Sequence, residues 1–129
     1  MNQVTIAQVE QILSQVMAGL IADAIWLKSY QQELSFSQVY GVVYHSRGLS
    51  KRVVAERASR IPAGTEGAAV YILMCLPERR LAIIKAYVAA GGDEAAIFVV
   101  ARLRARTPRI VRQVIASATA AELASPTPQ

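Results

Sequence analysis

Residues 37–61, SQVYGVVYHSRGLSKRVVAERASRI, contain the stretch that decides the fold. The apolar spacing of Ser37 to His45 predicts a short helix. Arg47-Gly48-Leu49 predicts a tight turn, because glycine adopts a left-handed backbone at little cost. Ser50 is a favourable N-cap for a second helix, Lys51 to Ile61. Two short helices joined by a tight turn predict a helix-turn-helix unit, and so an all-α protein.

The second helix of this unit has an apolar side and a polar side. Its apolar side packs in a corner formed by Val39, Val43, Leu49, Val54 and Ala58. The first residues of such a helix point into the major groove of DNA, so the base-reading candidates are Lys51, Arg52, Ala55 and Glu56. Arg52 suits a guanine edge, and Glu56 suits a cytosine amino group. The phosphate-contact candidates are Arg47, Ser50, Arg57 and Arg60. Alternatively, these are two ordinary amphipathic helices of a bundle.

The flanking sequence extends the all-helical pattern. An amphipathic helix is expected from about Thr5 to about Gln32, with Gly19 as a possible interruption. The apolar run Ala68 to Leu76 fits a buried strand as well as a buried helix. Further helices are expected over 78–90, from 93 to about 104, and from about 107 to about 121. We therefore divide the chain into a helix-turn-helix unit (1–61), a second helical unit (62–122) that serves as a repeat or in dimerisation, and a disordered tail (123–129).

The two halves of the sequence match as an internal repeat would, and chance matches between helices rich in Ala, Val and Arg are the alternative explanation. When the sequence is shifted by 57 residues, seven of the 27 positions from 28 to 54 are identical, among them Arg47 on Arg104 and Arg52 on Arg109. The second copy has Ala105 where the first has the turn glycine. Its phosphate-contact candidates are Arg104, Arg106, Thr107, Arg109 and Arg112. The second copy could read bases, clamp phosphates or only duplicate the structure.

Positive charge is concentrated in the same two regions. The formal net charge is +5, and residues 35–60 and 91–117 carry +4 and +3 of it, offset by acids elsewhere. Clustered cations attract a polyanion and release its counterions, which is typical of nucleic-acid binding. Two solvated basic faces on an unrelated protein would give the same count.

The scarcity of cysteine and histidine excludes several classes of protein. Cys75 is the only cysteine and His45 the only histidine, so we expect no disulfide framework, no metal site and no catalytic residues built on them. No cofactor-binding loop is present, and we expect no enzyme and no cofactor. The sequence lacks a secretory signal, and its best apolar run, Gly67 to Leu76, is about half of a membrane span. We expect a cytoplasmic protein.

Residues 4–88 resemble the plasmid transcriptional repressors of the TrfB (KorA) type. The resemblance is strongest at Gly48-Leu49-Ser50-Lys51-Arg52-Val53-Val54, which is similar to the start of their recognition helix. It also includes Val4-Thr5, Ile61-Pro62-Ala63-Gly64 and Leu76-Pro77-Glu78-Arg79. The resemblance implies a homodimer on a palindromic operator, with Lys51 and Glu56 facing bases and the part after residue 62 helping dimerisation. Residues 91–118 have no counterpart in it.

The expected function is that of a sequence-specific, double-stranded DNA-binding transcriptional regulator, a repressor of plasmid or mobile-element type. One alternative is a small basic subunit of a larger nucleoprotein assembly, such as the helical small subunits of CRISPR effector complexes, which would bind RNA or a nucleic-acid backbone without reading sequence. Another is an antagonist that docks on a protein regulator through the surface around Trp26 or residues 68–76.

Overall fold

The computed structural model describes residues 3–17 and 24–124, which form nine α-helices and no strand. The all-α prediction is therefore confirmed for this part of the chain. The helices are α1 (Ile6–Met17), α2 (Ala24–Gln32), α3 (Phe36–His45), α4 (Lys51–Ser59), α5 (Gly67–Cys75), α6 (Pro77–Ala89), α7 (Glu94–Leu103), α8 (Pro108–Ala116) and α9 (Ala120–Ala124).

Local capping signals set the beginnings of four helices. Ser35 begins α3 with a capping box, in which its side chain and that of Gln38 satisfy each other's backbone N–H groups. The side chains of Ser50, Asp93 and Thr107 accept backbone hydrogen bonds at the starts of α4, α7 and α8. Pro77 and Pro108 occupy first-turn positions, where a missing N–H costs nothing.

Three of the sequence expectations need correction. The long helix expected over 5–32 is two helices, α1 and α2, and Gly19 lies outside the described residues. The last expected helix ends at Ala116, and α9 follows after Ser117–Thr119. Leu123 and Ala124, which we placed in the tail, belong to α9, and the rest of that tail lies outside the described residues.

The ambiguous run 68–76 is a helix, α5. Its residues Ala69, Val70, Ile72, Leu73 and Met74 are buried, so apolar side chains face several neighbours and leave no polar stripe. Leu76 N donates to Ile72 O, and Pro77 then begins α6 at a sharp corner. Even so, α5 has nine residues, and no helix in the described part of the chain is both long and apolar enough to cross a bilayer.

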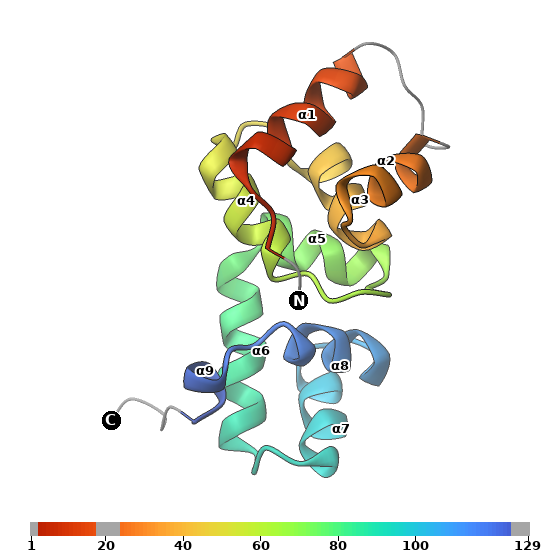
Figure 1. The fold of residues 1–129 in the computed structure, drawn as a ribbon. Coiled ribbons are helices and arrows are strands. Elements are labelled where there is room, and N and C mark those ends of the chain that lie inside the picture. The colour runs from red at the N-terminus through yellow and green to blue at the C-terminus, as the bar shows by residue number, and fades with distance from the viewer. Residues whose placement is uncertain (1–2, 18–23, 125–129) are drawn as a thin grey trace.

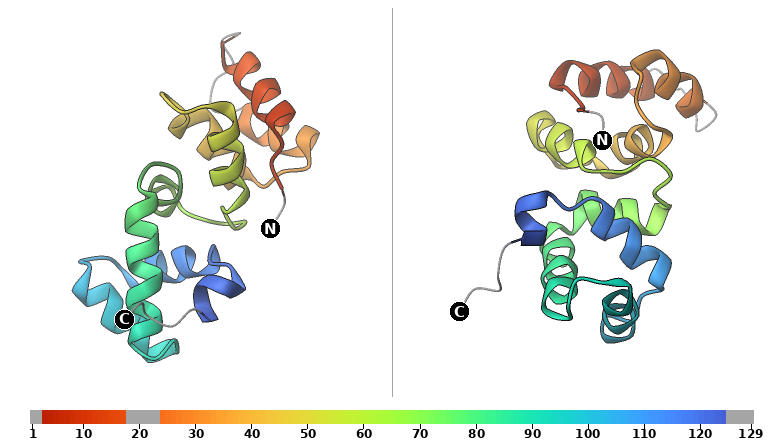
Figure 2. Two further views of the ribbon diagram at one scale, coloured as in Figure 1. Left: turned by 90° about the vertical axis from the view of Figure 1, so that its left-hand side faces the viewer. Right: turned by 60° about the horizontal axis from the view of Figure 1, so that its bottom comes forward.

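The helices form two groups that share α5. Figure 1 shows α1–α4 above, α6–α9 below and α5 between them, and the views in Figure 2 keep this division. In the upper group α1 packs on α3 and α4, and in the lower group α6 packs on α7 and α8. Helix α5 contacts members of both groups: α3, α4, α6 and α8. One continuous core of buried side chains therefore runs from Val4 to Val114.

The helix boundaries of the two halves follow a similar spacing. Helices α4 and α8 begin 57 residues apart, and both are preceded by a left-handed residue, Gly48 (φ 79°) or Ala105 (φ 52°). The N-caps of α3 and α7, Ser35 and Asp93, are 58 residues apart. The second turn is therefore one residue shorter than the first. The ungapped alignment at 57 is correct for the second helix of each unit and one residue out for the first.

Candidate nucleic-acid interface

The first unit, α3 and α4 with the turn 46–50, has a tightly fixed turn. Leu49 N donates to Ser46 O at 3.1 Å, and Gly48 has a positive φ that an L-residue adopts only at a cost. Ser50 Oγ accepts from Val53 N at 3.2 Å. The expected apolar corner forms: Val39, Val54 and Ala58 are buried, and Val43 and Leu49 pack against them. The start of α4 is thus held at a defined place on the surface.

The base-reading candidates on α4 do not share one free face. Lys51, Arg52 and Glu56 are exposed, but Ala55 is only 6% exposed, so its assignment to the outward face is wrong. The cause is α1, which packs along the side of α4 that carries residues 51, 55 and 59. Ser59 Oγ accepts from Val4 N at 2.8 Å, and Lys51 Nζ lies 3.8 Å from Glu10 Oε2. Arg52 and Glu56, one turn apart, are exposed and form no ion pair with a residue that the structure describes.

The phosphate-contact candidates of the first unit divide into free and engaged residues. Arg47 and Ser50 are exposed at the turn. Arg57 Nη1 donates to Met74 O at 2.5 Å, near the carboxyl end of α5, where a cation is favourable. Arg60 Nη1 lies 3.6 Å from Glu122 Oε2. Arg57 and Arg60 therefore help to join the two groups of helices, and only their remaining N–H groups are available to a ligand.

The second unit, α7 and α8 with the turn 104–107, places its candidates differently. Thr107 Oγ1 accepts from Ile110 N at 3.2 Å and so caps α8. Arg109 forms an ion pair with Glu66, and Arg112 forms one with Glu94. The Arg112 guanidinium also lies 5.5 Å from the centre of the Phe98 ring, a cation–π contact. Arg109 and Arg112 are thus already partly neutralised by carboxylates of the same chain.

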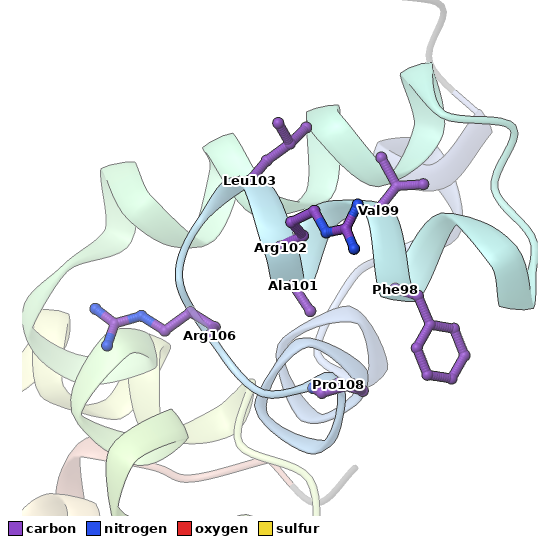
Figure 3. A pocket seen from close by; sticks show the side chains of 7 residues that line it. All are labelled: Phe98, Val99, Ala101, Arg102, Leu103, Arg106 and Pro108. Carbon is purple, nitrogen blue, oxygen red and sulfur yellow. The ribbon is translucent and has the colours of Figure 1, made fainter.

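Arg104 and Arg106, in the turn of the second unit, form no ion pair with any described acidic residue. The Arg106 Nε atom is buried and has no hydrogen-bond partner among the described residues. Figure 3 shows the Arg106 side chain pointing from its turn away from Phe98. This turn therefore supplies positive charge that no acidic residue in the described part of the chain neutralises.

An open cleft of about 650 Å³ brings the two units together at the α5–α6 corner. We name it the arginine cleft, because Arg57, Arg79 and Arg104 line it with a single acid, Glu78. Leu49 from the first turn lines it too. The positive charge around the cleft thus comes from three different segments of the chain.

Arg79 is the residue of this cleft that the sequence analysis missed. Its neighbour Arg80 is buried (4% exposed) and donates to both carboxylate oxygens of Glu122, at 2.8 and 2.7 Å, and to Ser117. The sequence does contain a signal that distinguishes the two arginines. Arg80 precedes Ile83 and Ile84 by three and four residues, so it lies on the same buried face of the helix. The other member of the doublet, Arg79, therefore had to point outward.

Burial and ion pairing shift the pKa values of three ionisable groups near these arginines. The hydrogen bonds from Arg80 lower the pKa of Glu122 to about 2. Burial lowers the pKa of His45, whose ring lies 5.4 Å from that of Tyr71, so His45 adds little charge to the turn at neutral pH. Burial also raises the pKa of the Cys75 thiol. The cationic character of the region therefore comes from arginine and lysine alone.

Comparison with known proteins finds no matching family model, and neither a curated protein nor a solved structure matches the chain significantly. In the described part of the chain, no three His, Cys, Asp or Glu side chains gather in a way that could hold a metal ion. Evidence about function therefore comes from the chain's own exposed side chains and their geometry.

Proposed function

We propose that the protein binds double-stranded DNA through the first unit and acts as a transcriptional repressor of plasmid or mobile-element type. The observation that carries the proposal is the start of α4, where Arg47, Ser50, Lys51 and Arg52 are exposed together on a turn that a buried apolar corner fixes. The resemblance of residues 48–54 to TrfB (KorA)-type repressors points the same way.

In this proposal the first turn of α4 enters the major groove. Arg52 donates two hydrogen bonds to a guanine edge, and Glu56, one turn further along, accepts from a cytosine amino group. Lys51 lies at the side where α1 crosses α4, so it contacts a base or phosphate at the rim of the groove. Phosphates contact Arg47 and the backbone N–H groups at the Ser50 cap, because a helix N-terminus attracts anions. Base contacts give specificity and phosphate contacts give position.

The arginine cleft adds affinity that does not depend on sequence. Arg79 and Arg104 have no acidic partner among the described residues, so a phosphate can replace water around them without breaking an ion pair. Each phosphate neutralised releases a condensed counterion and strengthens the salt dependence of binding. Occupation of a promoter by such a complex would exclude RNA polymerase, which is the simplest means of repression.

A second function is supported by the same cleft. Three arginines around one hollow suit the backbone of RNA as well as that of DNA, as expected of a basic subunit in a nucleoprotein assembly. In that case Arg52 and Glu56 would read no bases, and binding would be insensitive to sequence.

Selection from a random duplex-DNA library, at two salt concentrations and with single-stranded RNA as competitor, tests the proposal. We expect enrichment of a defined motif that persists at the higher salt concentration and in the presence of RNA. Binding without a motif, lost in salt and displaced by RNA, would refute sequence-specific repression and favour the backbone-binding subunit. Binding to neither nucleic acid would leave docking on a protein regulator as the remaining function.

A further inference from the structure

Four aromatic rings form one connected cluster on α3 and α5, two helices that pack against each other (Figure 1). Along α3, the ring centres of Tyr40 and Tyr44 are 4.7 Å apart. His45, the last residue of α3, joins this pair to α5, because its ring centre lies 5.9 Å from that of Tyr40 and 5.4 Å from that of Tyr71. We name these four side chains the aromatic platform.

The two outer rings of the aromatic platform are open to solvent. Tyr44 and Tyr71 are 46% and 47% exposed, although each contacts another ring of the platform. The other exposed residues of α5 are Gly67 and Ala68, which are too small to cover a neighbouring ring. Rings that are held by their neighbours lose little freedom when a planar ligand stacks on them. The platform therefore offers two preorganised surfaces for stacking.

Positive charge adjoins the aromatic platform at His45. The Cys75 Sγ atom lies 3.9 Å from His45 O, and Cys75 lines the arginine cleft with Arg79 and Arg104. Arg47, two residues after His45, is exposed on the turn. These three arginines form no ion pair with an acidic residue that the structure describes. Aromatic rings beside a basic groove are typical of single-strand binding, in which bases stack on the rings and phosphates contact the cations.

The tyrosine hydroxyls favour RNA as the single strand. Those of Tyr44 and Tyr71 have no hydrogen-bond partner among the described residues. A hydroxyl at the rim of a stacking ring can exchange a hydrogen bond with the ribose 2′-hydroxyl, which is both a donor and an acceptor and which DNA lacks. A duplex cannot use the platform in this way, because its bases already stack on one another.

We propose that the aromatic platform binds single-stranded RNA, with one base stacked on Tyr44 and another on Tyr71. The adjoining phosphates contact Arg47 and the arginine cleft. This binding uses unpaired bases and not the backbone alone, so it goes beyond the basic subunit considered above. It involves no side chain of the exposed face of α4, and it is therefore independent of the proposed reading of duplex DNA.

Titration of the full chain with a fluorescently labelled oligouridylate of about ten nucleotides, followed by anisotropy, tests the proposal. Tyr44→Ala and Tyr71→Ala should each weaken binding about fivefold or more, because each removes a stacking ring. Tyr30→Ala is the matched control and should leave binding unchanged. Tyr30 is 84% exposed on α2 and contacts no ring among the described side chains. Circular dichroism should show that every variant is folded.

Two further measurements separate the contributions of the sugar and the phosphates from that of the bases. The wild type should bind an oligodeoxyuridylate of the same length more weakly than the oligouridylate. The double variant Tyr44→Phe/Tyr71→Phe keeps both rings, so it should bind both strands but lose the preference for RNA. Arg79→Ala and Arg104→Ala should each lower the slope of log affinity against log salt concentration by about 0.7, because each removes one phosphate contact.

Several results would overturn the proposal. They are a wild-type protein that does not bind the oligouridylate, Tyr44→Ala and Tyr71→Ala variants that bind it like the wild type, and a Tyr30→Ala variant that is weakened as much as they are. Equal affinity of the wild type for the oligodeoxyuridylate would overturn the assignment to RNA. Selection of a duplex motif by a protein that does not bind the oligouridylate would refute this inference alone and leave the proposed repression standing.

Discussion

The first and second units have the same backbone plan but use their side chains in opposite ways. Ser50 and Thr107 cap α4 and α8 in the same manner, and a left-handed residue precedes each cap. Yet Arg52 is exposed and has no acidic partner among the described residues, whereas Arg109, its counterpart 57 residues later, is paired with Glu66. Helix α3 packs on α5 and leaves Tyr44 exposed, whereas α7 packs on α6 and α8 and leaves Phe98, Val99 and Leu103 exposed.

This difference shows that two similar backbone arrangements can leave their arginine side chains in different states of pairing. The sequence counts Arg109 and Arg112 as positive charge, but in the structure Glu66 and Glu94 neutralise much of it. The unused charge of the second unit lies in its turn, at Arg104 and Arg106, and not on its second helix. If the proposed DNA binding is correct, we therefore expect the first unit to read sequence and the second to contact the nucleic-acid backbone.

The largest expected effect concerns the ion pair that ties the C-terminal helix to both groups. Glu122→Ala leaves the buried Arg80 without its carboxylate and also removes the contact with Arg60, so the free energy of unfolding should fall by about 2–4 kcal/mol. Glu66→Ala, which breaks an exposed pair with Arg109, is the matched control and should cost about 0–1 kcal/mol. Urea denaturation measures both, and equal losses would contradict the assignment.

The same carboxylate should make stability depend on pH. The pKa of Glu122 is about 2 in the folded protein against an ordinary value of 4.5, so the unfolded state binds the proton more readily between these values. Stability from this group is complete above about pH 4.5 and is lost as the pH falls toward 2, by about 3 kcal/mol in total. Urea denaturation of the wild type and of Glu122→Gln between pH 6 and pH 2, a range that spans both pKa values of Glu122, tests this. The difference in unfolding free energy between the two proteins should shrink as the pH falls. A difference that stays constant would show that the Glu122 carboxylate does not cause the pH dependence.

Substitution of the two corresponding arginines compares the units as DNA readers. Arg52→Ala should weaken binding to the selected operator by about 1–3 kcal/mol and relax the preference at one base position. Arg109→Ala should weaken operator and random DNA equally and by less, because its guanidinium is already paired with Glu66. Fluorescence anisotropy on both DNAs measures this. If Arg109→Ala relaxes specificity and Arg52→Ala does not, the roles of the two units are reversed.

The smallest effect concerns the two turns. Gly48→Ala places a side chain at φ 79° and should destabilise the protein by about 1 kcal/mol, whereas Ala105→Gly relieves φ 52° and should stabilise it by about 0.5 kcal/mol. No atom outside the adjoining residues lies within 4 Å of a Cβ added at Gly48, so the cost is conformational. Thermal unfolding of both variants should show a lower stability for Gly48→Ala and a higher stability for Ala105→Gly. If both variants change stability in the same direction, the two turns are not equivalent.

Local signals in the sequence predicted most of the fold. The caps Ser50 and Thr107, the glycine at 48 and the apolar spacing of α3 and α4 are properties of neighbouring residues, so these elements were placed within a residue or two. The run 68–76 was undecided because its apolar residues have no period, and only contacts with four other helices make it a helix.

The candidate site depended on contacts that no local pattern contains. Ala55 is covered by α1, which comes some 40–50 residues earlier in the chain, and that cover cannot be read from α4 itself. The pairing of Arg109 with Glu66 spans 43 residues. Arg79 enters the arginine cleft because the α5–α6 corner brings it to Arg104 and Arg57. The sequence thus predicted the residue types of the candidate site, but not which of their side chains are exposed and unpaired enough to contact a ligand.

Helix α5 has a consequence for how the chain folds. It lies between the two groups and contributes buried side chains to both, so neither group can complete its core before α5 is in place. The two groups of helices therefore cannot unfold independently of each other. The amide protons of Val70 to Met74 should exchange with solvent only when the whole chain opens, more slowly than those at the ends of either unit.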